Sequence, residues 1–188
     1  NQTMIAGTNN AKLGSFTLTA GATEGVNINT IVVNLSANEA ATVTDLRLVD
    51  NSTGVQIGNT KSSPSSGDTA DNSYAVNIDI PASGSKTIDV VGNIKSGSNA
   101  GPWIAAIDTT TGGTGLTTGS SITTGGSDVA LQTITIGTGT LTDAVGTSPD
   151  DSNAVAGSSD VHVGNFKFTA QYSNFTVQEV LVKIPANL

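Results

Sequence analysis

Short runs in which apolar and polar residues alternate recur along the chain, a pattern typical of β-strands that bury one face. The clearest run, Tyr74 to Ile80, has a large apolar side chain at every second position. The other predicted strands are Thr42 to Val49, Gly54 to Gly58, Lys86 to Ile94, Trp103 to Asp108, Val129 to Ile136 and Gly139 to Val145. Gly, Pro, Asn, Asp and Ser cluster between them, and no sustained 3.6-residue apolar stripe appears. The pattern predicts an all-β chain with almost no helix.

The two ends of the chain resemble each other. Met4 to Ala20 aligns with Ala154 to Ala170 at a shift of 150 positions, and the shared residues include two glycines and a phenylalanine. After one deletion, the apolar pattern of residues 26–35 recurs in residues 175–184. A repeat of this length is natural for a series of β-sandwich domains. We expect an immunoglobulin-like or jelly-roll sandwich of about nine strands over residues 1–146, a connector over 147–153, and the first two strands of a second copy over 154–188.

Two segments depart from simple alternation. Apolar residues alternate up to Ile28 and restart one position out of phase at Ile31, which predicts a bulge or a crossing between sheets near Asn29 and Thr30. A simple turn between two strands is the alternative. Thr109 to Asp128 is nearly pure Thr, Gly and Ser, so it is either a mobile loop or a weakly specified edge ribbon.

Charge and composition narrow the classes of partner. The formal net charge is −8, from 7 Lys and Arg against 15 Asp and Glu, and the basic residues are scattered. Nucleic acids and anionic membranes attract clustered positive charge, so neither is an expected partner. No apolar run approaches the roughly 20 residues of a membrane span. The chain has no cysteine, which excludes disulfides and thiolate sites.

Catalytic patterns are weak. The single histidine, His162, lies between two valines and is expected to be a solvent-facing strand residue. There is no G-x-S-x-G nucleophile motif, and the glycine-rich segment carries no lysine and leads into no helix, unlike a phosphate-binding loop. We therefore predict that the chain is not an enzyme and uses no catalytic cofactor.

An acidic cluster is the one candidate metal site. Asp150, Asp151, Asn153 and Asp160 crowd the predicted connector, and their oxygen atoms could bind Ca²⁺ and stiffen an array of domains. The alternative is a solvated acidic linker, because the spacing is not that of an EF-hand.

Acceptor sequences for N-glycosylation, Asn-x-Ser/Thr, begin at Asn1, Asn34, Asn51 and Asn174. Asn34 falls within a predicted strand. Asn51 falls in the predicted turn Asp50 to Gly54, so it is the best candidate.

The repeated opening segment, the polar connector and the phrase VNIDIPASGSKTIDVVGNI at Val76 to Ile94 resemble a known kind of module. They are similar to the immunoglobulin-like β-sandwich repeats of large surface proteins of bacteria and archaea, which build S-layers, stalks and extracellular fibres. The resemblance implies an extracellular or cell-surface structural protein, often glycosylated and sometimes calcium-binding. Its partners would be copies of itself in a homopolymer or adjacent repeat domains.

The second copy has only two predicted strands before Leu188, and two strands cannot bury an apolar face in water by themselves. Three explanations are open: the domain continues beyond this sequence, the tail inserts into a neighbouring molecule as a donor strand, or it closes the chain's own sandwich. Strand donation predicts that Val161 to Ile184 packs against a sheet of another domain or molecule. The assembly residues would be Phe166, Phe168, Phe175, Val177, Val180, Val182 and Ile184.

Two function classes follow from these patterns. The first is a structural subunit of an extracellular filament, pilus-like fibre or surface layer that assembles by β-strand complementation. The second is an adhesin or carbohydrate-binding module of a multidomain surface protein, with recognition by loops at one end of the sandwich. Carbohydrate sites usually need exposed aromatic residues, and the aromatic content is only 4%, which favours the structural class.

Overall fold

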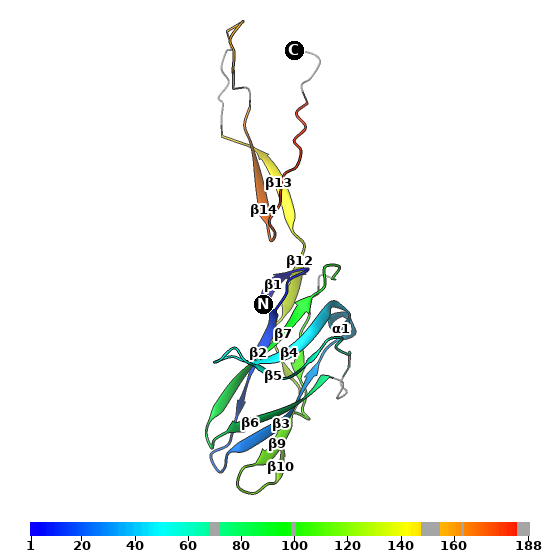
Figure 1. The fold of residues 1–188 in the computed structure, drawn as a ribbon, viewed down its shortest axis with the longest axis vertical. Helices are drawn as coiled ribbons and strands as arrows, with labels where there is room; N and C mark the ends of the chain where they lie inside the picture. The colour runs from blue at the N-terminus through cyan, green and yellow to red at the C-terminus, as the bar shows by residue number, and fades with distance from the viewer. Residues whose placement is uncertain (68–71, 99–100, 148–154, 163, 184–188) are drawn as a thin grey trace. The chain divides into compact units, whose positions relative to one another are not determined.

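A computed structural model describes residues 1–67, 72–98, 101–147, 155–162 and 164–183. It divides the chain into two compact units, Asn1–Gly137 (unit 1) and Thr138–Leu188 (unit 2). The all-β prediction is confirmed, because nearly every described element is a strand and the one helix has six residues (Figure 1).

Unit 1 contains two main sheets that share one hydrophobic core. The first sheet is antiparallel, with the spatial order β2 (Ala11–Thr19), β7 (Ser85–Ile94), β4 (Val43–Asp50) and β5 (Gln56–Lys61). The second is centred on β3 (Val26–Asn34), which pairs with β6 (Ser73–Ile80) on one side and with β8 (Ala106–Ile107) and β9 (Gly112–Gly115) on the other. It ends in β10 (Ser121–Thr123), beside β9, and β11 (Val129–Ala130), beside β8. A parallel pair, β1 (Gln2–Ile5) and β12 (Ile134–Gly137), completes the unit.

The two sides of this sandwich differ. On one side β5 and β6 contact each other, and Gly58 approaches the backbone of Ala75. On the other side β2 is the edge of the first sheet, and β10 and β11 are the edges of the second. The sandwich is therefore closed where β5 meets β6, whereas its other side is bordered by three edge strands.

Alternation along the strands builds the core. Leu46 and Leu48 of β4 are 0% exposed, as is Ile88 of β7. Tyr74 of β6 is 1% exposed and its hydroxyl donates to the carbonyl oxygen of Leu46 at 3.0 Å, which joins the two sheets across the core. Burial of one leucine or isoleucine side chain, such as Leu46, contributes about 1.5–3 kcal/mol to the free energy of unfolding.

Four predicted strands agree with the structure to within one residue at each end, and these are β4, β6, β7 and β13 (Thr140–Val145). The run from Trp103 to Asp108 keeps only the two residues of β8, while Trp103 forms an isolated bridge to Ile134. The segment rich in Thr and Gly forms the β9–β10 ribbon, which is the edge-ribbon alternative. Unit 1 has the strands β1 to β12 rather than about nine, because several have only two to four residues. The immunoglobulin-like or jelly-roll topology stays a prediction.

The predicted irregularity in β3 is confirmed as a bulge. The register shifts between Ile28 and Thr30 against both β6 and β9. Beyond the bulge, Ile31, Val32 and Val33 are at most 1% exposed. The bulge therefore changes the phase of the strand where β3 enters the centre of the unit.

The helix α1 (Ala37–Thr42) owes its position to a capping box. The backbone N–H of Ser36 donates to Glu39 Oε2 at 2.7 Å, and the N–H of Glu39 donates to Ser36 Oγ at 3.3 Å. Both bonds satisfy N–H groups that a helix N-terminus leaves free.

Replacing Ser36 with alanine is expected to lower the free energy of unfolding by about 1 kcal/mol, because one capping bond is lost. Urea unfolding followed by the fluorescence of Trp103, the only tryptophan, would measure this change. Ser96→Ala, in an exposed turn, is the matched control. Equal stability of the two variants would contradict the cap's role.

Unit 2 contains β13 (Thr140–Val145) and β14 (Phe166–Gln171), which pair antiparallel. The division after Gly137 groups β13 with the second copy, whereas the sequence boundary was expected after Gly146. Two strands were expected in the second copy, but residues 172–183 form no strand, so β14 is the one strand in the described part of residues 154–188. His162 is exposed but lies outside any strand.

The repeat is visible in the backbone. Positive φ angles recur at equivalent positions of the two copies: 85° at Gly7 and 89° at Gly157, 56° at Asn10 and 57° at Asp160. The turn hydrogen bond from residue 8 to residue 5 also recurs from residue 158 to residue 155, each at 3.1 Å. Residues 5–10 and 155–160 therefore form similar turns, and together with the sequence match of Phe16 to Phe166 this makes β14 the counterpart of the second half of β2.

Candidate functional site

Strand β2 presents an open edge in unit 1. It pairs with β7 on one side, and in the described part of the chain no strand pairs with its other side. At Ser15 both backbone groups point to that other side, where the side chain of Gln132 bonds them. Because backbone direction alternates along a strand, the N–H and C=O groups of Thr17 and Thr19 also point away from β7.

Gln132 occupies one position of this edge as a neighbouring strand would. Its Oε1 accepts from the N–H of Ser15 at 2.7 Å, and its Nε2 donates to the C=O of Ser15 at 3.4 Å. Gly14 makes the approach possible, since a Cβ there would lie 2.7 Å from Gln132 Oε1 and 2.8 Å from Leu131 Cβ. The open part of the edge thus begins after Ser15.

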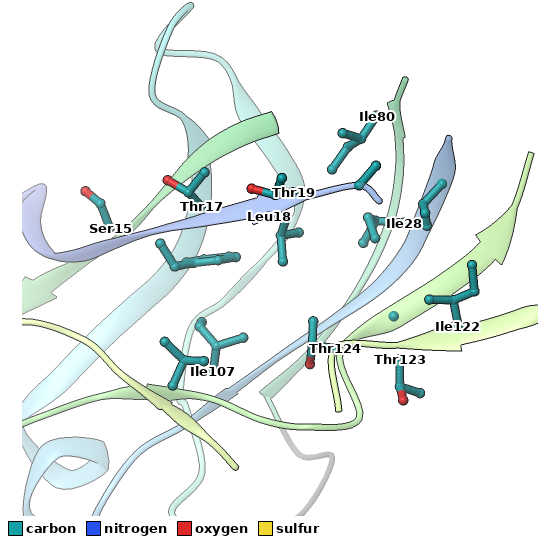
Figure 2. Close-up of a pocket in the computed structure, with 15 residues that line it drawn as sticks. Ser15, Thr17, Leu18, Thr19, Ile28, Ile80, Ile107, Ile122, Thr123 and Thr124 are labelled. Atoms are coloured by element: carbon teal, nitrogen blue, oxygen red, sulfur yellow. The ribbon is translucent and has the colours of Figure 1, made fainter. Parts of the chain in front are cut away.

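A cavity of about 380 Å³, which we call the β2 groove, lies along this edge (Figure 2). Its lining residues are Ser15, Phe16, Thr17, Leu18, Thr19, Ala20, Val26, Ile28, Ile80, Ile107, Gly112, Ile122, Thr123, Thr124 and Val129. They come from β2, from β3, β6, β8 and β9, and from the edge of the second sheet at β10 and β11 and the residue after β10. The groove therefore lies on the side of the sandwich that β5 and β6 leave open.

The chemistry of the groove is apolar inside and hydroxyl-bearing at its rim. In Figure 2, Leu18 points from β2 towards Ile107, while the side chains of Thr17 and Thr19 stand on the opposite face of the strand. None of the lining residues is charged. Such a surface suits a segment that brings apolar side chains and backbone hydrogen-bonding groups together, and it does not suit a charged ligand.

Unit 2 presents an apolar face that is not covered within the described part of that unit. Residues directly opposite in an antiparallel pair share a face, so Val145 and Phe166 lie together, as do Leu141 and Ala170. Val145 is 90% exposed, and the rings of Phe166 and Phe168 meet edge to face at 5.5 Å. Every residue of β13 and β14 is exposed.

The predicted assembly residues are all exposed where they are described: Phe166, Phe168, Phe175, Val177, Val180 and Val182. Ile184 lies outside the described residues. Burial of this segment against another molecule stays a prediction. What the sequence reasoning missed is the β2 groove in unit 1, because the pairing that leaves β2 at an edge is set by β7, about 70 residues further along the chain.

Most of the predicted calcium cluster falls outside the described residues, namely Asp150, Asp151 and Asn153. Asp160 is exposed in a bend. Among the residues that the structure describes, no group of three or more His, Cys, Asp or Glu residues could hold a metal ion. Calcium binding at the connector stays a prediction.

The four glycan acceptors lie in different environments. Asn51 is exposed in the predicted turn, and Asn1 and Asn174 are exposed as well. Asn34 is only 6% exposed, and its Nδ2 donates to Asp108 Oδ2 at 2.8 Å and to Asp128 Oδ2 at 2.9 Å. A glycan would be attached through this buried nitrogen, so Asn34 is the least accessible acceptor in the folded chain, and glycosylation at all four positions stays a prediction.

Two carboxylates in the first sheet are held in the ionised form. Lys86 and then Ser52 hydrogen-bond Asp50 and hold its pKa well below the usual range. Burial acts to raise the pKa of Asp89, but bonds from Lys12, Ser15 and Asn51 outweigh it and lower this pKa. The Asp89 network also ties β2 to β7 at the end of the open edge.

Unit 1 is therefore expected to lose stability in acid. A carboxyl group whose pKa is lower in the folded state stabilises the fold above its unfolded pKa, about 3.9 for Asp, and this contribution is lost as pH falls through the folded pKa. Urea unfolding at pH 7 and pH 3 should show lower stability at pH 3, and Asp50→Asn should reduce the difference. A pH dependence unchanged in Asp50→Asn would contradict this assignment.

No protein-family model, curated protein or solved structure matches the chain. In the part of the chain that the structure describes, no helix is long and apolar enough to cross a membrane.

Proposed function

We propose that the chain is a structural subunit of an extracellular filament, pilus-like fibre or surface layer, and that neighbouring copies assemble by β-strand complementation. The observation that carries the proposal is the open edge of β2 beside the β2 groove. A strand laid there would bond the backbone groups of Thr17 and Thr19 and would cover the apolar residues that line the groove.

The architecture of the chain supports this role. An open strand edge next to apolar surface is a site for pairing with another chain, and proteins that remain monomeric usually block it. Gln132 blocks the edge only at Ser15. The internal repeat supplies further strands of the same kind in every copy. The proposed partners are copies of the same chain or adjacent repeat domains, and the proposed role needs no catalytic cofactor.

The aromatic residues weigh against the alternative of a carbohydrate-binding module. All three aromatic residues of unit 1 are buried: Phe16 at 7% exposure, Tyr74 at 1% and Trp103 at 5%. Sugar recognition by stacking needs an exposed ring, so unit 1 offers no such platform. This weighs against a sugar-stacking site in unit 1 only, because four aromatic residues of unit 2 are exposed: Phe166, Phe168, Tyr172 and Phe175.

Electron microscopy of the purified full chain at increasing concentration tests the proposal. Polymers with a fixed axial repeat are expected, and Thr17→Pro should prevent them because it removes an outward-facing N–H from the open edge. Unfolding followed by Trp103 fluorescence would show that unit 1 still folds in this variant. Uniform monomers of the unmodified chain at every concentration would overturn the proposal.

A further inference from the structure

We propose that β13 of a second copy of this chain is the strand that occupies the β2 groove. It would pair antiparallel with β2, with Ala144 opposite Thr17 and Thr142 opposite Thr19. This inference rests on the proposed function and adds the identity of the donor and its register. It also changes the donor expected from the sequence. The tail was expected to donate a strand, but its strand β14 corresponds to β2, which is the acceptor.

The first step is the equivalence of β2 and β14. Phe16, Thr19 and Ala20 have identical counterparts 150 residues later, and the turn that precedes each strand has the same φ angles and the same hydrogen bond. The partner of β14 in unit 2 is β13. In unit 2, the counterpart of β2 is thus paired with β13, so β13 is a strand that this opening segment of the repeat can bind.

The second step is that the same edge of the strand is used. The N–H of Gly146 donates to the C=O of Asn165 at 2.8 Å, which shows that Asn165 directs its backbone carbonyl to the side of β13. By alternation, Lys167 and Thr169 also direct their backbone groups to β13. Their counterparts in unit 1 are Thr17 and Thr19, the open positions of β2. The counterpart of Asn165 is Ser15, which Gln132 bonds in place of a strand.

The third step concerns the side chains that would enter the groove. In unit 2, Val145 lies opposite Phe166 and Leu141 lies opposite Ala170. Transferred to β2, these two apolar residues would lie beside Phe16 and Ala20, both of which line the groove. Asp143 would lie between them, beside Leu18, so its carboxylate would have to accept a hydrogen bond from a threonine hydroxyl of the groove, because an unpaired charge would oppose docking at this uncharged site. Thr140, Thr142 and Ala144 would stand on the outer face.

Strand β13 would bury more apolar surface in the groove of a second copy than it buries in its own chain. Within its own chain β13 is exposed along its whole length, with Val145 at 90% and Leu141 at 43%. In the groove, β13 would still bond to a strand edge, because Thr17 and Thr19 direct their backbone groups outward as Lys167 and Thr169 do in unit 2. Its apolar side chains would then enter a cavity lined by Phe16, Leu18 and the isoleucines of the second sheet. Burial of apolar area therefore favours the groove, and it has to outweigh the loss of the β13–β14 pairing, because Lys167 and Thr169 of β14 lose their strand partner in the exchange.

Cross-linking of full chains tests the register. The chain has no cysteine, so single cysteines introduced by Thr17→Cys in one copy and Ala144→Cys in another can form a disulfide only between chains. A hydrogen-bonded antiparallel pair has Cα atoms about 5.5 Å apart, which suits a disulfide. Mixing the two variants under mild oxidation should give a covalent heterodimer, identified by mass spectrometry, at least 10-fold faster than the control.

The control replaces Ala144→Cys with Thr140→Cys, on the same strand and face but four residues out of register, about 13 Å away at the strand rise. Cross-linking no faster than this control would overturn the assignment and leave the groove to a partner of other chemistry or to a small apolar ligand. Faster cross-linking through Asp143→Cys would also overturn it, because β13 would then dock through its other edge while still paired with β14.

A pair of adjacent substitutions tests the side chains in the groove. Val145→Asp would place a charge beside Phe16, whereas Ala144→Asp would place it on the outer face of the same strand. Both positions are exposed in the free chain, so neither change should unfold unit 1. Val145→Asp should raise the concentration needed for polymers roughly 10- to 100-fold, and Ala144→Asp should change it little. Equal effects of the two would overturn the assigned face.

The outcomes separate this inference from the proposed function. Polymers that form without the cross-link between positions 17 and 144 would overturn the donor and keep the structural role. A chain that stays monomeric and does not cross-link would overturn both.

Discussion

Replacing Leu46 with alanine is expected to lower the free energy of unfolding of unit 1 by about 2 to 5 kcal/mol, the cost of a buried Leu-to-Ala change. Leu46 is 0% exposed in β4, and its carbonyl oxygen accepts the hydroxyl of Tyr74, itself 1% exposed. The surroundings are held from both sheets and can collapse only partly into the space left. Urea unfolding followed by Trp103 fluorescence measures the loss.

Val55→Ala is the matched control, because Val55 is 62% exposed and the change should cost well under 1 kcal/mol. If Leu46→Ala destabilised unit 1 no more than Val55→Ala, the two sheets would not share the core described above.

Local pattern sufficed for the strands whose two faces differ. Tyr74 to Ile80 alternates cleanly, and β6 forms there because one face meets the core. The change of phase after Ile28 predicted the bulge, since a slip of one residue would otherwise turn the apolar face of β3 outward. Such features depend on neighbours in sequence and can be read directly.

The helix and the short strands were harder to predict. The capping box of Ser36 and Glu39 is visible in the sequence, but α1 has only six residues and no apolar stripe, so the hydrophobic pattern gives no sign of it. Strands such as β8 and β11 have two residues each. Strand β8 forms because it pairs with β3, and β11 forms because it pairs with β8. A pairing partner distant in sequence has no local signature.

The candidate site was only half visible in the sequence. The apolar tail residues that were predicted to mediate assembly, such as Phe166 and Val182, are exposed, and their contacts with another molecule stay a prediction. The β2 groove depends on the spatial order of two sheets and on the side chain of Gln132, 117 residues from Ser15. The repeat was the available sequence signal for the donor strand. The predicted strand Gly139 to Val145 comes shortly before the second copy, and β14 is the strand of that copy that corresponds to β2.

Gly113→Ala is the second change expected to be severe, and it would act on the wall of the groove. A Cβ at this position would overlap the carbonyl oxygen of Asn27 in β3, and that oxygen belongs to backbone that cannot rotate away. Strand β3 is held by β6 on its other side, so β9 would have to move instead. We expect a loss of about 1 to 3 kcal/mol from overpacking, with faster amide hydrogen exchange in β9 and β10.

Gly97→Ala is the control, since a Cβ at this exposed turn would have no atom within 4 Å. Equal stability and exchange in the two variants would show that β9 does not depend on its close approach to β3. Because Ile122, Thr123 and Thr124 line the groove opposite β2, displacement of the β9–β10 ribbon should also weaken polymer formation although β2 and β13 are unchanged. The glycines that make this ribbon look weakly specified in sequence are thus what allow it to lie against β3 and border the acceptor site.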